Sequence, residues 1–128
     1  INDCYNANPN SMENALNTLS DLKCKGKKIA VLADMLELGD ATYSEHKEII
    51  NKATKSANIV FIYGKHFGEV FNKEKYFYQE NFNKSMHYFS DKSTLISDLK
   101  KTISDNDIVL VKGSRGMKLE EIILELKK

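Results

Sequence analysis

Ile29-Ala30-Val31-Leu32-Ala33 is an unbroken apolar run that directly follows the basic turn Lys25-Gly26-Lys27-Lys28. Two further runs of this kind occur at residues 59–63 and 108–111, and a weaker candidate lies at residues 86–89. Apolar runs without alternation are typical of strands covered on both faces, as in a parallel sheet between helices. The first three residues have the character of a further strand, cut at its start.

Helical periodicity fills the segments between these runs. Asn8-Pro9 predicts a capped helix start, Thr42 with Glu45 predicts a capping box, and Asp91 predicts the cap of a later helix. A last helix is expected after Gly116, whereas residues 67–85 predict only a short helix and a loop. The alternating order predicts a Rossmann-like, three-layer α/β domain with a mostly parallel sheet of about five or six strands.

Composition excludes several classes of function. The 128 residues suffice for one domain, and a net charge of +1 gives no electrostatic argument for nucleic acid or a membrane surface. No apolar run is long enough for a membrane helix, and two distant cysteines fit a reducing, cytoplasmic compartment. The chain begins at Ile1 without a signal peptide, so we expect a piece of a longer protein.

The segment Lys112-Gly113-Ser114-Arg115-Gly116 carries the clearest local chemistry, because it links a buried strand to a helix. Free backbone N–H groups at a helix start, together with Lys112 and Arg115, favour a bound carboxylate or phosphate. The alternative is an ordinary helix start with solvated basic side chains.

Other candidate residues are less specific. The amides of Asn2, Asn6, Asn8 and Asn10 suit a nucleotide sugar or a peptide, but turns and caps are the simpler interpretation. Asp34 with Glu37 could form an acid pair, although a carboxylate paired with a lysine is the simpler interpretation. His46 is interpreted as structural and partly exposed, and His87 as a surface position, while His66 at a strand end is a better site candidate.

The sequence lacks the common phosphate-binding and metal-binding patterns. It contains no G-x-x-x-x-G-K-[ST] and no G-x-G-x-x-G, and its histidines and cysteines have no metal-ligand spacing. If this chain meets ATP, the phosphate loop comes from elsewhere.

Three blocks together resemble the C-terminal domain of the Mur ligases, and among them the member that completes the cytoplasmic peptidoglycan precursor. The blocks are Asp-Cys-Tyr-Asn-Ala-Asn-Pro-Asn-Ser-Met at residues 3–12, Ile-Ala-Val-Leu-Ala-Asp-Met-Leu-Glu-Leu-Gly at residues 29–39 followed by His46, and Val-Lys-Gly-Ser-Arg-Gly-Met at residues 111–117. Ala33 departs from the pattern where glycine is common, as do Asn2 and Cys4 where Asp and Ser or Thr are common.

The resemblance implies a three-domain enzyme of which residues 1–128 are the last domain. The first domain would hold UDP-N-acetylmuramoyl-tripeptide, and the central domain would bring the phosphate loop and the Mg²⁺ ligands. ATP would activate the tripeptide carboxylate as an acyl phosphate, which the amine of D-alanyl-D-alanine would attack. The last domain would close over the nucleotide, and alone it would be inactive and without bound cofactor.

The resemblance also implies roles for particular residues. Those expected near ATP are Asp3, Tyr5, Asn6 and Asn8, and those expected near the dipeptide are Lys65, His66, Lys112, Ser114 and Arg115. No catalytic base and no metal ligand is expected in this part of the enzyme. Two alternatives remain, a free-standing nucleotide- or anion-binding module and a non-catalytic interaction domain.

Overall fold

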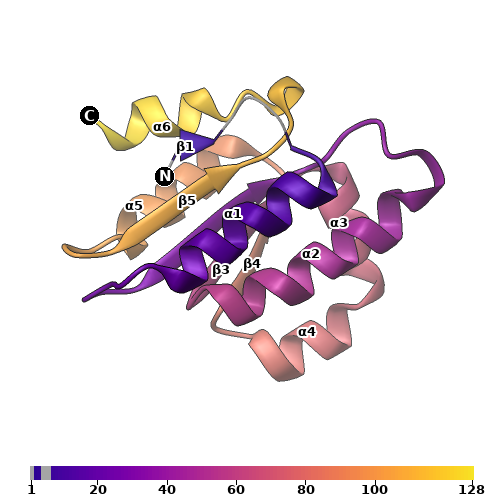
Figure 1. The fold of residues 1–128 in the computed structure, drawn as a ribbon, viewed down its shortest axis with the longest axis horizontal. Coiled ribbons are helices and arrows are strands. Elements are labelled where there is room, and N and C mark those ends of the chain that lie inside the picture. Colours follow the sequence, from indigo (N-terminus) through magenta and orange to yellow (C-terminus); the bar gives the residue numbers. More distant parts are fainter. Residues whose placement is uncertain (1, 4–6) are drawn as a thin grey trace.

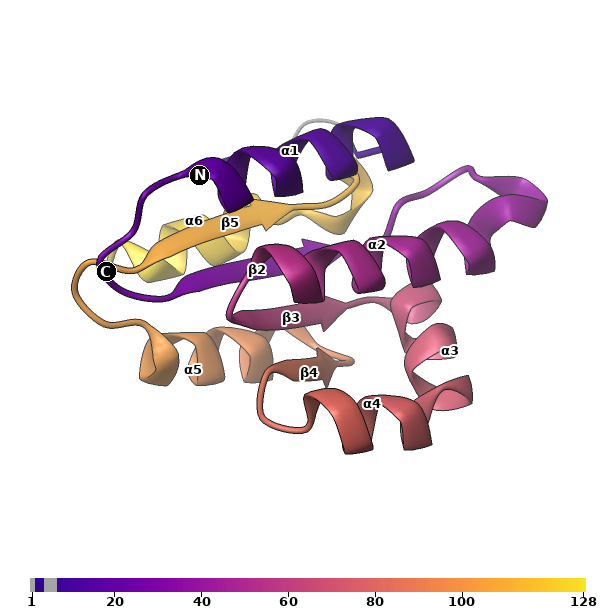
Figure 2. The same cartoon turned by 60° about the horizontal axis from the view of Figure 1, so that its bottom comes forward.

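The computed structural model of the protein describes residues 2–3 and 7–128 and is built in three layers, with a sheet between two sets of helices (Figures 1 and 2). The strands are β1 (Asn2–Asp3), β2 (Lys28–Ala33), β3 (Ile59–Tyr63), β4 (Met86–Phe89) and β5 (Ile108–Lys112). The α-helices are α1 (Pro9–Asp21), α2 (Thr42–Ser56), α3 (Lys65–Lys73), α4 (Lys75–Phe82), α5 (Lys92–Thr102) and α6 (Glu120–Leu126). Short 3₁₀ turns at Gly39–Ala41 and Arg115–Met117 precede α2 and α6.

The five strands of the described sheet lie in the order β1-β5-β2-β3-β4 and are all parallel. This confirms the predicted parallel sheet, including its short first strand and the weaker one at Met86–Phe89. The three long apolar runs form β2, β3 and β5. These adjacent strands make up the middle of the sheet.

Side-chain alternation along β2 divides the core into two parts. Ala30 and Leu32 pack with α1, α2 and α3, whereas Ile29, Val31 and Ala33 pack with α5 and α6. All five side chains are fully buried. A strand whose two faces both lie in a core must be apolar at every position, which explains the unbroken run in the sequence.

Two predicted helix caps are confirmed. Asn8 Oδ1 accepts the Ser11 N–H at 2.8 Å, the Asn8 N–H donates to Ser11 Oγ at 3.0 Å, and Pro9 is the first residue of α1. Asp91 Oδ1 accepts the Thr94 N–H at 2.8 Å at the start of α5. Both caps follow from side chains that reach only local partners, so local sequence suffices to predict them.

Two local predictions are wrong. Thr42 with Glu45 forms no capping box, because the 3₁₀ turn Gly39–Ala41 leads directly into α2 and Thr42 is already helical. Residues 65–82 form two helices, α3 and α4, where the sequence predicts a short helix and a loop. Burial of Phe67 and Val70 against the rest of the core stabilises α3.

The connections reverse direction between β2 and β5. The helix after β2 covers one face of the sheet, and the helix after β5 covers the other face. Open parallel sheets bind ligands at the carboxyl ends of strands where such a reversal occurs. The topology therefore indicates that a ligand would bind at the turns that follow β2 and β5.

None of the described helices has the length and apolar character required to cross a membrane.

Candidate functional site

The strand register brings three turns together at the carboxyl edge of the sheet. Leu32 of β2 lies beside Lys112 of β5, and Ala33 of β2 lies beside Tyr63 of β3. Asp34 therefore leaves β2 between the turns that follow β3 and β5. These turns carry five of the predicted site residues, Lys65, His66, Lys112, Ser114 and Arg115.

Asp34 bonds to both neighbouring turns. Its carboxylate, almost fully buried, accepts the His66 N–H at 2.8 Å and the Phe67 N–H at 2.9 Å. Its own N–H donates to the Tyr63 carbonyl at 3.2 Å, and its carbonyl accepts the Ser114 N–H at 3.0 Å. Of the two carboxylates considered for a lysine pair, Asp34 is not the one, because the two backbone amides at the start of α3 satisfy it instead.

Gly64 makes this arrangement possible. Its φ is +118°, and a β-carbon at this position would lie 2.4 Å from the carboxyl carbon of Asp34. Glycine tolerates such a backbone and leaves room for the carboxylate. The N-terminal end of α3 is thus occupied by a side chain of the protein itself, so a substrate carboxylate has no free amide pair there.

Ser114 also bonds within the fold. Its Oγ accepts the Leu36 N–H at 2.9 Å and lies 3.5 Å from the Ala7 carbonyl oxygen, to which it donates. Ser114 is 9% exposed and Lys112 is 1% exposed. Both side chains are thus largely buried, and their roles in binding substrate stay predictions.

The turn after β5 does not lead directly into a helix, so the predicted helix start at the anion site is wrong, while anion binding by Arg115 stays a prediction. The chain forms a 3₁₀ turn and a left-handed residue, Lys118, before α6 begins at Glu120. Glu120 and Glu121 occupy the first turn of α6, where their negative charges already complement the helix dipole. Arg115 remains exposed and forms no ion pair with any residue in the described ranges.

The side chain of His46 holds the turn that follows β2 through hydrogen bonds to the backbone. The ring is fully buried, its Nε2 accepts the Met35 N–H at 3.0 Å, and its Nδ1 lies 2.6 Å from the Thr42 carbonyl oxygen. Burial lowers the pKa of His46, although the Thr42 carbonyl and the Asp34 carboxylate act in the opposite direction. The structural interpretation of His46 is confirmed, but the predicted partial exposure is wrong.

The remaining predicted site residues differ in their exposure and in their hydrogen bonds. Lys65 is exposed at the start of α3, His66 is half-buried, and the side-chain oxygen of Asn8 is used in capping α1. The backbone of Asp3 lies beside Lys112 in the sheet. Its side chain and the whole of Tyr5 and Asn6 lie outside the described residues.

The described residues contain no ready-made cluster of metal ligands. In residues 2–3 and 7–128, the side chains that the structure describes include no group of three or more His, Cys, Asp or Glu that could hold a metal ion. The sequence also lacks a phosphate loop.

Asp34 is the residue that sequence reasoning undervalued. Its position directly after a buried strand, followed by Gly64 after the neighbouring strand, was the available signal. This pattern identifies Asp34 as a bridging residue only when the register of β2 against β3 is known, since Asp34 and Gly64 are 30 positions apart in the chain.

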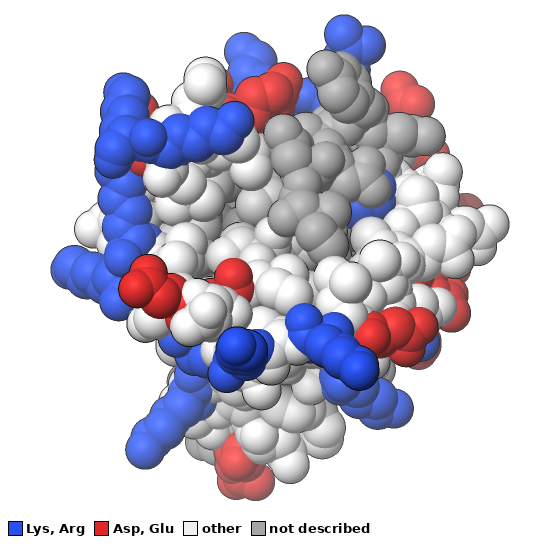
Figure 3. All heavy atoms as spheres, turned by 60° about the vertical axis from the view of Figure 1, so that its left-hand side comes forward, with Lys and Arg blue, Asp and Glu red and all other residues white. Residues whose placement is uncertain are grey.

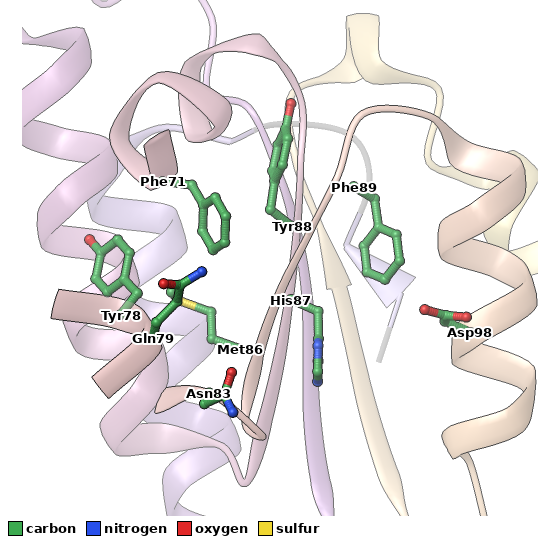
Figure 4. Close-up of a pocket in the computed structure, with 9 residues that line it drawn as sticks. All are labelled: Phe71, Tyr78, Gln79, Asn83, Met86, His87, Tyr88, Phe89 and Asp98. Atoms are coloured by element: carbon green, nitrogen blue, oxygen red, sulfur yellow. The ribbon is translucent and has the colours of Figure 1, made fainter. Parts of the chain in front are cut away.

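A cavity of about 310 Å³ lies elsewhere, at the open edge of the sheet (Figure 4). Phe71, Tyr78 and Met86 line it on one side of β4, and His87 and Asp98 lie on the other side. Of the predicted ATP and dipeptide residues whose side chains the structure describes, none lines this cavity. The carboxyl edge, and not this cavity, is the candidate functional site.

Lysines gather at the opposite end of the molecule (Figure 3). The turns before β2 and β5 lie at this end and are joined there by the Lys27–Asp107 ion pair at 2.8 Å. Lysines at this end of the sheet lie far from Arg115, which follows the carboxyl end of β5.

The comparisons with known proteins agree with the fold. The family model described as "Mur ligase, glutamate ligase domain" matches residues 1–115. The UDP-N-acetylmuramoyl-tripeptide–D-alanyl-D-alanine ligase of Bacillus subtilis is 39% identical over 98% of this chain and 27% of its own length. The ligase of the same name from Escherichia coli is 31% identical over 99% of this chain and 26% of its own length.

Solved structures show the same fold. The MurF structure from Acinetobacter baumannii aligns with a TM-score of 0.81 and 25% identity, covering 98% of this chain and 27% of that chain. MurF from Thermotoga maritima, solved in complex with ADP, aligns with a TM-score of 0.79 and 23% identity over 99% of this chain. The chain thus spans about a quarter of the length of these relatives. With the family model matching nearly its whole length, the chain belongs to the Mur ligase family and carries that family's glutamate ligase domain.

Proposed function

We propose that this chain is the C-terminal domain of an ATP-dependent ligase that joins D-alanyl-D-alanine to UDP-N-acetylmuramoyl-tripeptide in the cytoplasm. The observation that carries the proposal is the agreement of the B. subtilis and E. coli relatives in name and in coverage of this chain. The position of Lys65 and Arg115 at the carboxyl edge, on turns beside the reversal of the sheet, supports it.

The reaction has two steps in this proposal. The tripeptide carboxylate attacks the terminal phosphorus of ATP, which gives an acyl phosphate and ADP. The neutral amine of D-alanyl-D-alanine then attacks the acyl carbon, the new amide bond forms, and phosphate leaves while the amine loses a proton. This chain supplies neither a phosphate loop nor a metal site among its described residues, so other domains of the enzyme would hold the triphosphate.

The contribution of this domain is to hold the acceptor dipeptide. The dipeptide carries one carboxylate, and a guanidinium or ammonium can bind it by a charge-assisted hydrogen bond. Arg115 and Lys65 are exposed and form no ion pair with other described residues, so both are available. Holding the amine about 3 Å from the acyl carbon is what makes such positioning effective.

The test uses the full-length protein that contains this chain. Purified enzyme is incubated with ATP, Mg²⁺, UDP-N-acetylmuramoyl-tripeptide and D-alanyl-D-alanine, and both phosphate and the pentapeptide product are measured. We expect product formation that depends on all three substrates, and none from residues 1–128 alone. Product formation by the isolated domain, or a full-length protein that uses a different acceptor, would contradict the proposal.

A further inference from the structure

Asp34 connects the two turns that carry the exposed cations of the candidate site. Its carboxylate binds the amides of His66 and Phe67, directly after Lys65, while its carbonyl binds the amide of Ser114, directly before Arg115. The carboxylate thereby holds the segment that carries Lys65, and the backbone carbonyl holds the segment that carries Arg115, so one residue bridges the two turns. The carboxylate is 2% exposed, so water does not compete with these bonds.

We propose that Asp34 is a positioning residue for the acceptor dipeptide, acting through Lys65 and Arg115. This inference rests on the proposed function. Asp34 does not touch substrate in this scheme, because its carboxylate is buried and already accepts two backbone N–H groups.

The geometry explains why the effect should be selective for the acceptor. Among the described residues, the bonds of Asp34 lead to the turns after β3 and β5 and none leads to Asn8 at the start of α1. The residues proposed for the dipeptide lie on the first two turns, whereas those proposed for ATP lie before α1. Asp34→Asn changes only the side-chain bonds to His66 and Phe67, so it shifts the segment after β3 that carries Lys65. The backbone bond to Ser114, and through Ser114 the contact with Ala7 beside Asn8, stays in place.

A plain helix cap is the alternative role, and the chain contains a matched control for it. Asp91 caps α5 by accepting the Thr94 N–H at 2.8 Å, and it lies on another helix without bonds to either turn. Asp34→Asn and Asp91→Asn each replace a capping carboxylate by an amide of the same size. The amide can accept one N–H through its oxygen, but its NH₂ group cannot accept the second.

The experiment compares both variants in the full-length ligase by steady-state kinetics. For Asp34→Asn we expect KM for D-alanyl-D-alanine to rise about tenfold, with KM for ATP within about twofold of wild type. Asp91→Asn should leave both KM values within about twofold. Equal effects of the two variants, or an equal rise in both KM values for Asp34→Asn, would overturn the inference. Wild-type enzyme that forms no product would instead overturn the proposed function.

A second set of variants tests whether Asp34 acts through the two cations. In a Lys65→Ala/Arg115→Ala background, Asp34→Asn should change KM for the dipeptide by less than about twofold. A further tenfold rise in that background would show an independent role and contradict the inference. If Asp34→Asn fails to fold, Gly64→Ala takes its place, since its β-carbon would displace the Asp34 carboxylate. The same selective rise is then expected.

Discussion

The Nε2 of His46 accepts the backbone N–H of Met35 at 3.0 Å. This bond requires an unprotonated Nε2, so the ring proton lies on Nδ1, which donates to the Thr42 carbonyl at 2.6 Å. The buried ring is therefore neutral in the folded protein, and both of its nitrogen atoms are used. A histidine in the second turn of α2 thus anchors the chain directly after Asp34.

The neutral ring predicts a pH-dependent stability. Burial lowers the pKa of His46 in the folded state, so the unfolded chain binds a proton more readily below its ordinary pKa of 6.5. The contribution is fully present above pH 6.5 and is lost as the pH falls. Over the first pH unit below 6.5 the loss is at most about 1.4 kcal/mol.

Urea unfolding at about pH 7.5 and about pH 5.5 measures this loss. His46→Gln keeps an oxygen that can accept the Met35 N–H but cannot titrate, so its stability should depend less on pH over this interval. Wild type and His46→Gln with the same pH dependence would show that His46 is not the group responsible.

Gly113 lies against the methyl group of Ala33. A β-carbon at residue 113 would lie 2.6 Å from Ala33 Cβ and 2.8 Å from Leu119 Cδ1. Gly113→Ala should therefore destabilise the fold by about 1–3 kcal/mol through overpacking. Adding Ala33→Gly should recover part of that loss, because it removes one of the two clashing groups.

Gly116→Ala is the control for this prediction. Its β-carbon would meet Leu36 Cδ1 at 3.1 Å, and that side chain is exposed and can rotate away. Thermal unfolding of the three variants should place Gly113→Ala lowest. A double variant no more stable than Gly113→Ala would remove Ala33 as the cause.

Asp107 joins the turns at the amino end of the sheet. Its carboxylate forms an ion pair with Lys27 and accepts the backbone N–H groups of Lys27 at 2.7 Å and Ser104 at 2.9 Å. The Lys27 side chain and these amides lower the pKa of Asp107 from 3.8 to about 2. The stability it contributes is present above pH 3.8 and is lost as the pH falls through about 2.

Asp107→Asn should lower the denaturation midpoint at neutral pH and flatten the acid limb of the stability curve. Asp105→Asn, at an exposed carboxylate for which the described structure shows no partner, is the matched control and should leave both unchanged. Chemical denaturation across the acid range measures both effects. Equal curves for the two variants would show that the three bonds of Asp107 contribute no net stability.

Arg115 is expected to act on the acceptor. In the full-length enzyme, Arg115→Ala should raise KM for D-alanyl-D-alanine roughly tenfold to a hundredfold, the loss of a charge-assisted bond of about 1.5–3 kcal/mol. KM for ATP should change much less. Lys101→Ala removes an exposed cation from the lysine-rich end and should leave both constants unchanged. Equal losses for dipeptide and ATP would remove Arg115 from the acceptor site.

The sequence by itself determined those elements that depend on local chemistry. The run Ile29–Ala33 had to be a strand with two covered faces, because no polar side chain interrupts it. Asn8 and Asp91 had to be caps, because their side chains bond to amides three residues away. The three blocks at residues 3–12, 29–39 and 111–117 together sufficed to indicate the family, since each is contiguous in the chain.

Only the tertiary structure decided what those residues contact. The role of Asp34 depends on the register of β2 against β3 and β5, and no local pattern contains that register. The same holds for Ser114, whose hydroxyl accepts the N–H of Leu36, a residue 78 positions away in the chain. It also holds for α3, which is stabilised as a helix by packing its apolar face on the core. Long-range hydrogen bonds and burial act between segments that meet only on folding, so their partners cannot be deduced from neighbours in the sequence.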